Sequence, residues 1–323
     1  MVARSAATRG LVALAATAIG FAARPARADD FLHRLVADAR ARVDAEAAAH
    51  APRPVPPVPV AVKWRPAKLT SIDLGAPLVA LTAADLDGDG KAELYAVTTH
   101  DVIAIGWRGK RLDELARVPF AGDVAVPVPR DPVGTAVADG RALVASTSGF
   151  ARALRVTWQG KQLVGAPGEA DFELCPGEHA KLVPGRDVLE GNRYAVVCRD
   201  LVDATGAPLH VRGELAATGR LAVDAGTAHF EVPEVGVAFE LADLDHDGTP
   251  EVIYAGAGAP GDPDSVKVVS LGGDPRKPRW KKPFTAGGVA GIAVGDLDGD
   301  KAPEVIAAVR LVGATRVDLW RLE

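Results

Sequence analysis

The hydrophobic pattern along most of the chain is that of short strands. From Val62 onward, short apolar runs alternate with turns rich in Gly, Pro and Asp. Aromatic residues make up only 5% of the sequence, and no long amphipathic segment follows Val62. Short apolar runs bounded by turn residues predict an all-β fold.

One acidic segment recurs within this pattern. DLDGDGKAELYAV at 85–97, DLDHDGTPEVIYA at 243–255 and DLDGDKAPEVIAAV at 296–309 are close copies of one another. Each copy follows one apolar run and leads into the next, so each is predicted to be the loop of a β-hairpin. Two degenerate copies, around Asp139 and Glu190, keep the following apolar run but fewer acids.

The spacing of these copies sets the size of the repeat. The equivalent positions lie 50, 51, 57 and 53 residues apart, at Asp89, Asp139, Glu190, Asp247 and Asp300. A unit of this length that holds four short strands is typical of a β-propeller blade. The 261 residues from Lys63 to Glu323 therefore predict five blades of about 50–57 residues. A β-sandwich is the alternative architecture.

A second motif repeats with the same period. It follows each acidic turn by roughly 20 residues and reads WRGKRL (107–112), WQGKQL (158–163) and VRGEL (211–215). It is predicted to mark a later hairpin of each blade, with its tryptophans packed in the core. KWRPAKLTSIDL (63–74) and VDLWRL (317–322) are predicted to pair and close the ring, because closure removes free sheet edges.

The N-terminal residues follow a different pattern. Residues 1–28 combine arginines, the apolar run Leu11–Ala23 and a small-residue exit, which is the layout of a secretory signal peptide. A membrane anchor is the alternative, but the run is shorter than the roughly 20 residues that span a bilayer. Residues 29–50 predict a short N-terminal helix, residues 51–62 a proline-rich linker and residues 63–323 the propeller. The mature chain is therefore expected to be secreted or periplasmic, with no membrane span.

The acidic segments resemble the FG-GAP/VCBS repeats of integrin-α-like propellers, whose pattern is D-x-D-x-D-G-x-x-D/E before an apolar strand. As a period the resemblance covers most of residues 63–323, and the motif is close in three of the five copies. It implies a β-propeller with calcium in its loops and a carboxylate ligand at the ninth position. Integrin-type heads have more blades than this chain can hold, so blade number and partner do not carry over.

The residues of the acidic loops also have the chemistry of a calcium site. Each loop places four carboxylates within nine residues, and a backbone carbonyl adds a neutral oxygen. Such an all-oxygen shell suits a hard cation, and calcium tolerates irregular geometry better than magnesium does. The predicted ligands are Asp85, Asp87, Asp89, the Lys91 carbonyl and Glu93; Asp243, Asp245, Asp247, the Thr249 carbonyl and Glu251; and Asp296, Asp298, Asp300, the Ala302 carbonyl and Glu304.

The third of these loops departs from the pattern. Lys301 stands where the other two loops have Gly, at a position expected to need a backbone conformation that is costly for Lys. Two calcium sites are therefore expected, with a weakened third. The alternative is that the loops are plain Asp-Gly turns without metal. EF-hands are excluded, because no acid stands at position 12 and strands flank the loops.

Net charge limits the kinds of partner that the protein can bind, and its cysteines indicate the cellular compartment. Cleavage after residue 28 removes four arginines and no acids, so the formal net charge changes from −5 to −9. Nucleic-acid binding needs clustered Lys and Arg and is not expected. Cys175 and Cys198 are the two cysteines, and they are predicted to form a disulfide in an oxidising compartment.

No motif in the sequence defines a catalytic centre. Gly256 to Gly261 match G-x-G-x-x-G, but a loop and another strand are predicted after them instead of the helix of a dinucleotide site. The predicted innermost strands are mostly small and apolar, and no catalytic residue or organic cofactor is assigned. The sequence predicts a monomeric binding scaffold for a protein or a glycan. A propeller-based extracytoplasmic enzyme, a glycan hydrolase or lyase, is the alternative.

Overall fold

The computed structural model describes residues 36–37, 39–40, 54–120, 132–169, 172–180, 196–258, 262–311 and 315–322. The chain divides into two compact units, Met1–Arg53 and Pro54–Glu323. In the first unit the four described residues are helical and fall within the predicted helical segment. The predicted signal peptide and the remainder of that segment lie outside the described residues. No helix among the described residues has the length and apolarity needed to cross a bilayer.

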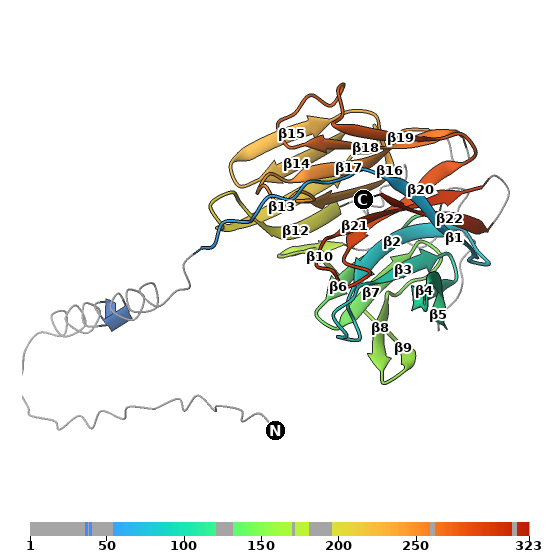
Figure 1. Cartoon of the computed structure of the whole chain (residues 1–323). Coiled ribbons are helices and arrows are strands. Elements are labelled where there is room, and N and C mark those ends of the chain that lie inside the picture. The colour runs from blue at the N-terminus through green and yellow to red at the C-terminus, as the bar shows by residue number, and fades with distance from the viewer. Residues whose placement is uncertain are drawn as a thin grey trace, which may run out of the picture. The chain divides into compact units, whose positions relative to one another are not determined.

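Five four-stranded antiparallel sheets form the described part of the second unit, and they are numbered here as blades in chain order (Figure 1). Blades one and two contain β2 (Leu78–Ala84), β3 (Glu93–Thr98), β4 (Asp101–Arg108), β5 (Arg111–Pro119), β6 (Gly134–Asp139), β7 (Ala142–Thr147), β8 (Leu154–Gln159) and β9 (Gln162–Pro167). Blades three and four contain β12 (Val196–Val202), β13 (Pro208–Leu215), β14 (Leu221–Ala225), β15 (Ala228–Val232), β16 (Val235–Ala242), β17 (Glu251–Gly256), β18 (Asp264–Ser270) and β19 (Trp280–Phe284). The predicted five-bladed propeller is confirmed.

The fifth blade joins the two ends of the propeller unit. It contains β20 (Gly288–Gly295), β21 (Glu304–Arg310), β22 (Arg316–Leu322) and, as its outermost strand, β1 (Pro66–Asp73). β1 pairs antiparallel with β22, and Asp318 accepts hydrogen bonds from Lys68 Nζ (2.7 Å) and Ser71 Oγ (2.6 Å). The predicted ring closure is therefore present.

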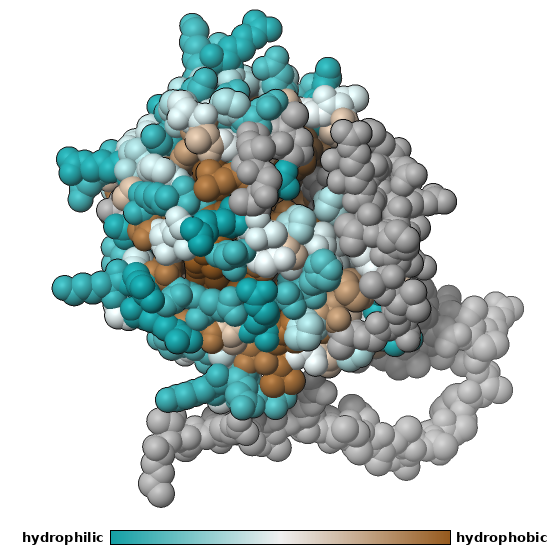
Figure 2. All heavy atoms as spheres, turned by 90° about the vertical axis from the view of Figure 1, so that its right-hand side faces the viewer, coloured by the Kyte–Doolittle hydropathy of each residue, from teal (hydrophilic) through white to brown (hydrophobic). Residues whose placement is uncertain are grey.

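The first strand of each blade faces the centre of the ring. Contacts join β2 to β6 and β20, and β16 to β12 and β20. The second strands pack between neighbouring sheets, so β3 is buried along its whole length and β17 and β21 along nearly all of theirs. Burial on both faces explains why these strands are continuous apolar runs instead of alternating ones. On the face shown in Figure 2, polar residues surround smaller separate groups of hydrophobic residues.

The predicted repeat frame is wrong in the third blade. The innermost strand of this sheet, β12, starts at Val196, and the turn after it spans 203–207, so the acidic turn has no counterpart at Glu190. Glu190 itself lies outside the described residues. VRGEL (211–215) lies inside β13, and the late hairpin of this blade turns at Gly226. The cause is an insertion between β9 and β12, which displaces the frame.

That insertion carries the predicted disulfide. It includes the two-stranded hairpin of β10 (Phe172–Cys175) and β11 (Glu178–Ala180). Cys175 at the end of β10 is bonded to Cys198 in β12. The disulfide therefore attaches the inserted hairpin to the innermost strand of blade three.

The described part of the proline-rich linker, residues 54–62, is extended and contacts blade four. Val60 N donates to the carbonyl of Asp245 (2.7 Å), in the loop between β16 and β17. Further along, the Trp64 ring stacks on that of Trp280 with centroids 5.5 Å apart. These contacts place the approach to β1 beside an acidic loop.

Candidate functional site

The three complete acidic segments occupy the same place in their blades. The first acidic loop (residues 85–92) joins β2 to β3, the second (243–250) joins β16 to β17, and the third (296–303) joins β20 to β21. Each is the turn between the innermost strand and its neighbour, as the hairpin prediction required. The corresponding turns of blades two and three, 140–141 and 203–207, are shorter.

Side-chain to backbone hydrogen bonds shape all three loops in the same way. In the first loop the carboxylate of Asp85 accepts from the amides of Gly88 (2.7 Å) and Gly90 (3.0 Å). Asp243 and Asp296 accept two loop amides each in the same manner, at 2.7–3.1 Å. The first-position aspartate therefore holds each loop in a tight curl that turns the other carboxylates inward.

The sixth position of each loop has a left-handed backbone. Its φ is 92° at Gly90, 80° at Gly248 and 72° at Lys301. The expected conformation at Lys301 is therefore present, and a Cβ makes it unfavourable there. The third loop keeps its shape at this cost.

Each loop brings three carboxylates together. One oxygen from each member of a set lies within 4.8 Å of the others, and the sets are Asp85, Asp87 and Glu93; Asp243, Asp245 and Glu251; and Asp296, Asp298 and Asp300. Of the other predicted ligands, Asp89, Asp247 and Glu304 belong to the same loops but not to these sets. The carbonyls of Lys91, Thr249 and Ala302 remain predicted ligands; the amides of these residues bond the fifth-position aspartates at 2.7–2.8 Å.

The ninth-position glutamates are buried. Glu93, Glu251 and Glu304 are 5%, 0% and 4% exposed. Glu251 accepts the amide of Leu244 (2.9 Å) and Glu304 that of Leu297 (2.7 Å), which ties the start of the second strand to the loop. Burial, with added repulsion from nearby aspartates, raises the pKa of each of the three glutamates to about 7. These carboxyls therefore favour a proton or a nearby cation.

The loops differ in what faces the ninth-position glutamate. Tyr95 Oη donates to Glu93 (2.9 Å) and accepts from Trp158 Nε1 (2.8 Å). Glu251 instead faces the guanidinium of Arg279, and the Arg279 Nη1 lies 2.8 Å from the Glu251 Oε1. Glu304 lies 3.9 Å from Arg321 Nη1. The three loops thus share a backbone shape but differ in local charge.

A buried oxygen without a partner provides a test of the fit to a cation. Asp245 is 8% exposed, and its Oδ1 has no hydrogen-bond partner among the described residues. Leaving a charged oxygen buried and unsatisfied is costly, whereas a bound cation would satisfy it. This oxygen in the second loop, together with the three convergent carboxylates of each set, fits a divalent cation with oxygen ligands.

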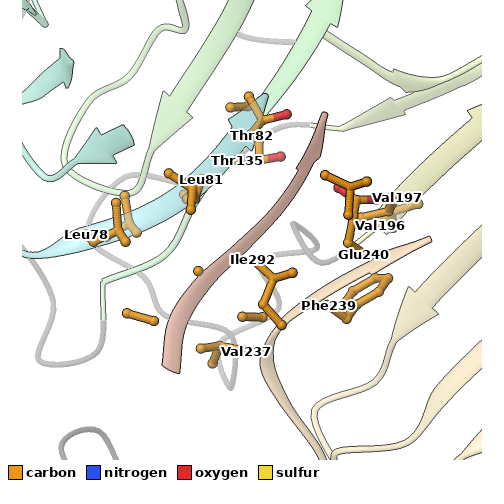
Figure 3. Close-up of a pocket in the computed structure, with 18 of the residues that line it drawn as sticks. Leu78, Leu81, Thr82, Thr135, Val196, Val197, Val237, Phe239, Glu240 and Ile292 are labelled. Atoms are coloured by element: carbon orange, nitrogen blue, oxygen red, sulfur yellow. The ribbon is translucent and has the colours of Figure 1, made fainter. Parts of the chain in front are cut away.

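A second site lies at the centre of the ring. The five innermost strands enclose a cavity of about 1040 Å³, whose wall includes Leu81, Thr82, Thr135, Phe239 and Ile292 (Figure 3). Small and aliphatic side chains dominate β2 and β20, as predicted, and they also dominate β6.

A charged pair in the cavity wall was missed at the sequence level. Glu240 of β16 is 3% exposed and bonds the guanidinium of Arg199 from β12. The Glu240 Oε1 accepts the amide of Leu241 (2.8 Å), and burial raises the pKa of this carboxyl. Beside them, His210 Nδ1 lies 2.8 Å from Asp200 Oδ1. The sequence signal that could have revealed this pair is Glu240 itself, a charged residue inside the apolar run GVAFELA.

Two further sequence features have structural roles. Trp107, Trp158 and Trp320 lie in the third strands of their blades, partly buried against the hydrophobic cores, which agrees with packing. Gly256 ends β17 and Asp264 begins β18, so a strand follows the G-x-G-x-x-G segment, as predicted.

Residues 243–307 match the FG-GAP-like repeat family, and they include the second and third acidic loops. Five four-stranded sheets in a closed ring define the chain as a β-propeller. Residues 243–307 are thus an FG-GAP-like repeat within this β-propeller, and the fold supports a generic binding scaffold.

Among curated proteins, none matches the chain. Among solved structures, BBS1N in complex with ARL6DN aligns at 12% identity and a TM-score of 0.34, covering 82% of this chain and 98% of that one. A mutant of AofleA from Arthrobotrys oligospora aligns at 14% identity and a TM-score of 0.33, covering 74% and 68%. The core factor of S. cerevisiae aligns at 9% identity and a TM-score of 0.34, covering 78% and 48%.

Proposed function

We propose that this chain is an exported β-propeller whose acidic loops bind calcium and whose rigid surface binds a protein or a glycan. The observation that carries the calcium assignment is that three loops each gather three carboxylates within 4.8 Å. Export is supported by the signal-peptide layout of residues 1–28 and by the Cys175–Cys198 disulfide. Disulfides persist in oxidising compartments, where calcium is also abundant enough for weak sites.

The first acidic loop illustrates how the chain would hold the ion. Asp85 is fixed by two backbone amides, and Asp87 of the same loop and Glu93 at the start of β3 converge with it. Bound Ca²⁺ would supply the positive charge that offsets repulsion among these carboxylates. Asp89 and the Lys91 carbonyl are the remaining proposed ligands.

The effect of the ion would extend beyond one blade. Ala92 N, at the end of the first loop, donates to the carbonyl of Asp296 in the third loop (2.7 Å). Cations in these two loops would therefore stiffen the junction between blade one and blade five, and blade five is the sheet that closes the ring. The proposed role of calcium is structural.

Calorimetry on the mature chain tests calcium binding. We expect two or three ions to bind, and Asp87→Ala to remove one of them because this side chain belongs to the first carboxylate set. Asp139→Ala is the matched control, since its turn lacks such a set. At a calcium concentration 100 times the dissociation constant, one site should add about 2.7 kcal/mol to the free energy of unfolding. No binding heat in millimolar calcium, with a melting curve unmoved by chelator, would leave the loops as plain turns.

The wall of the central cavity favours a scaffold over the enzyme alternative. Both oxygens of Glu240 are engaged, one by Arg199 and one by the amide of Leu241. A general acid or base needs a carboxyl that reaches its substrate, and this one is held inside the wall.

A turnover screen on polysaccharides and glycosides separates the two functions. We expect no turnover, together with capture of one saturable protein or glycan ligand from envelope extracts. Reproducible turnover that survives Asp87→Ala but is lost in Glu240→Gln would favour the hydrolase or lyase instead.

A further inference from the structure

One cation of the chain already occupies the second acidic loop. Arg279 Nη2 lies 2.6 Å from Asp245 Oδ2, and its Nη1 lies 2.8 Å from Glu251 Oε1. Asp245 and Glu251 are two of the three carboxylates gathered in this loop. The guanidinium therefore bridges two groups that a divalent ion would also need.

Few oxygens remain open at this loop. Glu251 Oε1 also accepts from Ser270 Oγ (3.1 Å), and its Oε2 accepts the amide of Leu244, so both oxygens are engaged. Asp245 keeps only Oδ1 without a partner. A guanidinium stays protonated at every physiological pH, so this internal cation keeps its charge wherever a divalent ion could bind.

The position of Arg279 has a clear structural origin. It ends the nine-residue connection 271–279 between β18 and β19, which lies at the same end of blade four as the second acidic loop. Leu271 N donates to the carbonyl of Pro250 (2.8 Å), which attaches the start of the connection to that loop. Next to Arg279, Trp280 stacks on Trp64, which fixes the other end.

The other two loops lack this arrangement. In blade one the equivalent turn, residues 109–110, has only two residues and is too short to reach the first acidic loop. Glu93 there meets the neutral donor Tyr95, and no ion pair to Asp87 or Glu93 occurs among the described residues. In the third loop Arg321 approaches from β22 itself, at 3.5 Å from Asp298 and 3.9 Å from Glu304.

We propose that Arg279 is a built-in competitor for the divalent cation at the second acidic loop. It holds Asp245 and Glu251 in place without metal, and calcium has to displace it in order to bind there. The order of calcium affinity is then first loop, third loop, second loop. This inference rests on the proposed calcium binding.

Calcium titration of the mature chain and of Arg279→Gln tests the competition. Removing the guanidinium should tighten one site by about tenfold or more, because charge-assisted hydrogen bonds no longer oppose the ion. Adding Asp243→Asn should abolish that gain and assign it to the second loop. The melting temperature of Arg279→Gln should also fall further under chelator than that of the unchanged chain. Arg276→Gln is the control, since among the described contacts only its backbone is used, with Asp274.

The direction in which calcium affinity changes in Arg279→Gln shows whether the guanidinium competes with the ion or helps to hold its ligands. Weaker calcium binding in Arg279→Gln would show that the guanidinium orients the ligands, and unchanged binding would show that it plays no part; either result overturns the inference. Arg279→Lys keeps the charge but not the bridge, so it should fold and tighten binding by a smaller factor.

Calcium binding by the unchanged chain, compared with binding by the variants, distinguishes a failure of this inference from a failure of the proposed function. If Asp87→Ala loses calcium binding but Arg279→Gln binds calcium as the unchanged chain does, the proposed function is supported and the competition by Arg279 is overturned. Binding that appears only in Arg279→Gln would support the competition and overturn calcium binding by the natural chain. No binding in either protein would overturn both.

Discussion

Calcium-free protein should lose stability as the pH is raised from 5 to 8, and calcium should abolish that loss. Burial raises the pKa of Glu93 from 4.5 to about 7 in the folded chain. The unfolded glutamate releases its proton near pH 4.5, so between these values the folded state binds more protons and stability falls as the pH rises. The loss is complete above pH 7 and amounts to about 3 kcal/mol for Glu93 alone. Glu251 and Glu304 shift in the same direction.

Urea unfolding at intervals from pH 5 to pH 8 measures this loss. It is carried out once with chelator and once with 10 mM calcium, which is about 100 times the dissociation constant of a moderately weak site. Glu93→Gln removes one of the three titrating glutamates and should make the chelator profile less steep, whereas Asp139→Asn, at an exposed position, should leave it unchanged. Calcium acts because a nearby cation stabilises the ionised carboxylates and lowers their pKa. A flat profile in chelator would mean that the glutamates are ionised in the folded chain without any ion.

Replacing Arg199 with Met should lower the free energy of unfolding by about 3 kcal/mol, because it leaves Glu240 buried without its cation. Arg199 and Glu240 lie on adjacent innermost strands, β12 and β16, so their pairing also joins blades three and four. Since burial raises the pKa of Glu240, the unpaired carboxyl should take up a proton. The loss should therefore shrink at pH 5.

The double variant Arg199→Met/Glu240→Leu should recover most of the loss, since replacing both members of a buried pair by apolar groups is often neutral. Arg212→Met is the matched control in the neighbouring strand. Its partners Glu178 and Glu214 are 46% and 38% exposed, and exposed pairs contribute less than about 1 kcal/mol. Equal losses of unfolding free energy in Arg199→Met and Arg212→Met would show that the buried pair of Arg199 and Glu240 stabilises the fold no more than an exposed pair does. Chemical unfolding in urea gives all four values.

Local and periodic features could be predicted from the sequence. The three acidic loops, the five blades and the pairing of β1 with β22 follow from turn residues and apolar runs that recur along the chain. Even the left-handed backbone at Lys301 follows from comparison with Gly90 and Gly248 in the equivalent loops. Repetition lets one copy predict another.

Features that occur once could not be predicted in this way. Arg279 reaches Asp245 across 34 residues of sequence, and Arg199 reaches Glu240 across 41. Nothing in the composition of GGDPRKPR (272–279) distinguishes an arginine that enters an acidic loop from one that faces solvent. The prediction for the third blade was wrong for a related reason. The apolar residues after Glu190 include Val196 and Val197, which begin the innermost strand β12 and not the second strand of a blade.

The closure of the ring has a consequence for how the chain reaches its folded state. β1 bonds to a strand about 250 positions later, so its edge has no partner until β22 is available. A polypeptide that is synthesised from its N-terminus therefore exposes this strand until the C-terminal residues appear, and can complete its last sheet only afterwards. Contacts between such distant segments raise the contact order, which slows the acquisition of structure. In the finished protein, by contrast, neither end of the ring is left free to fray.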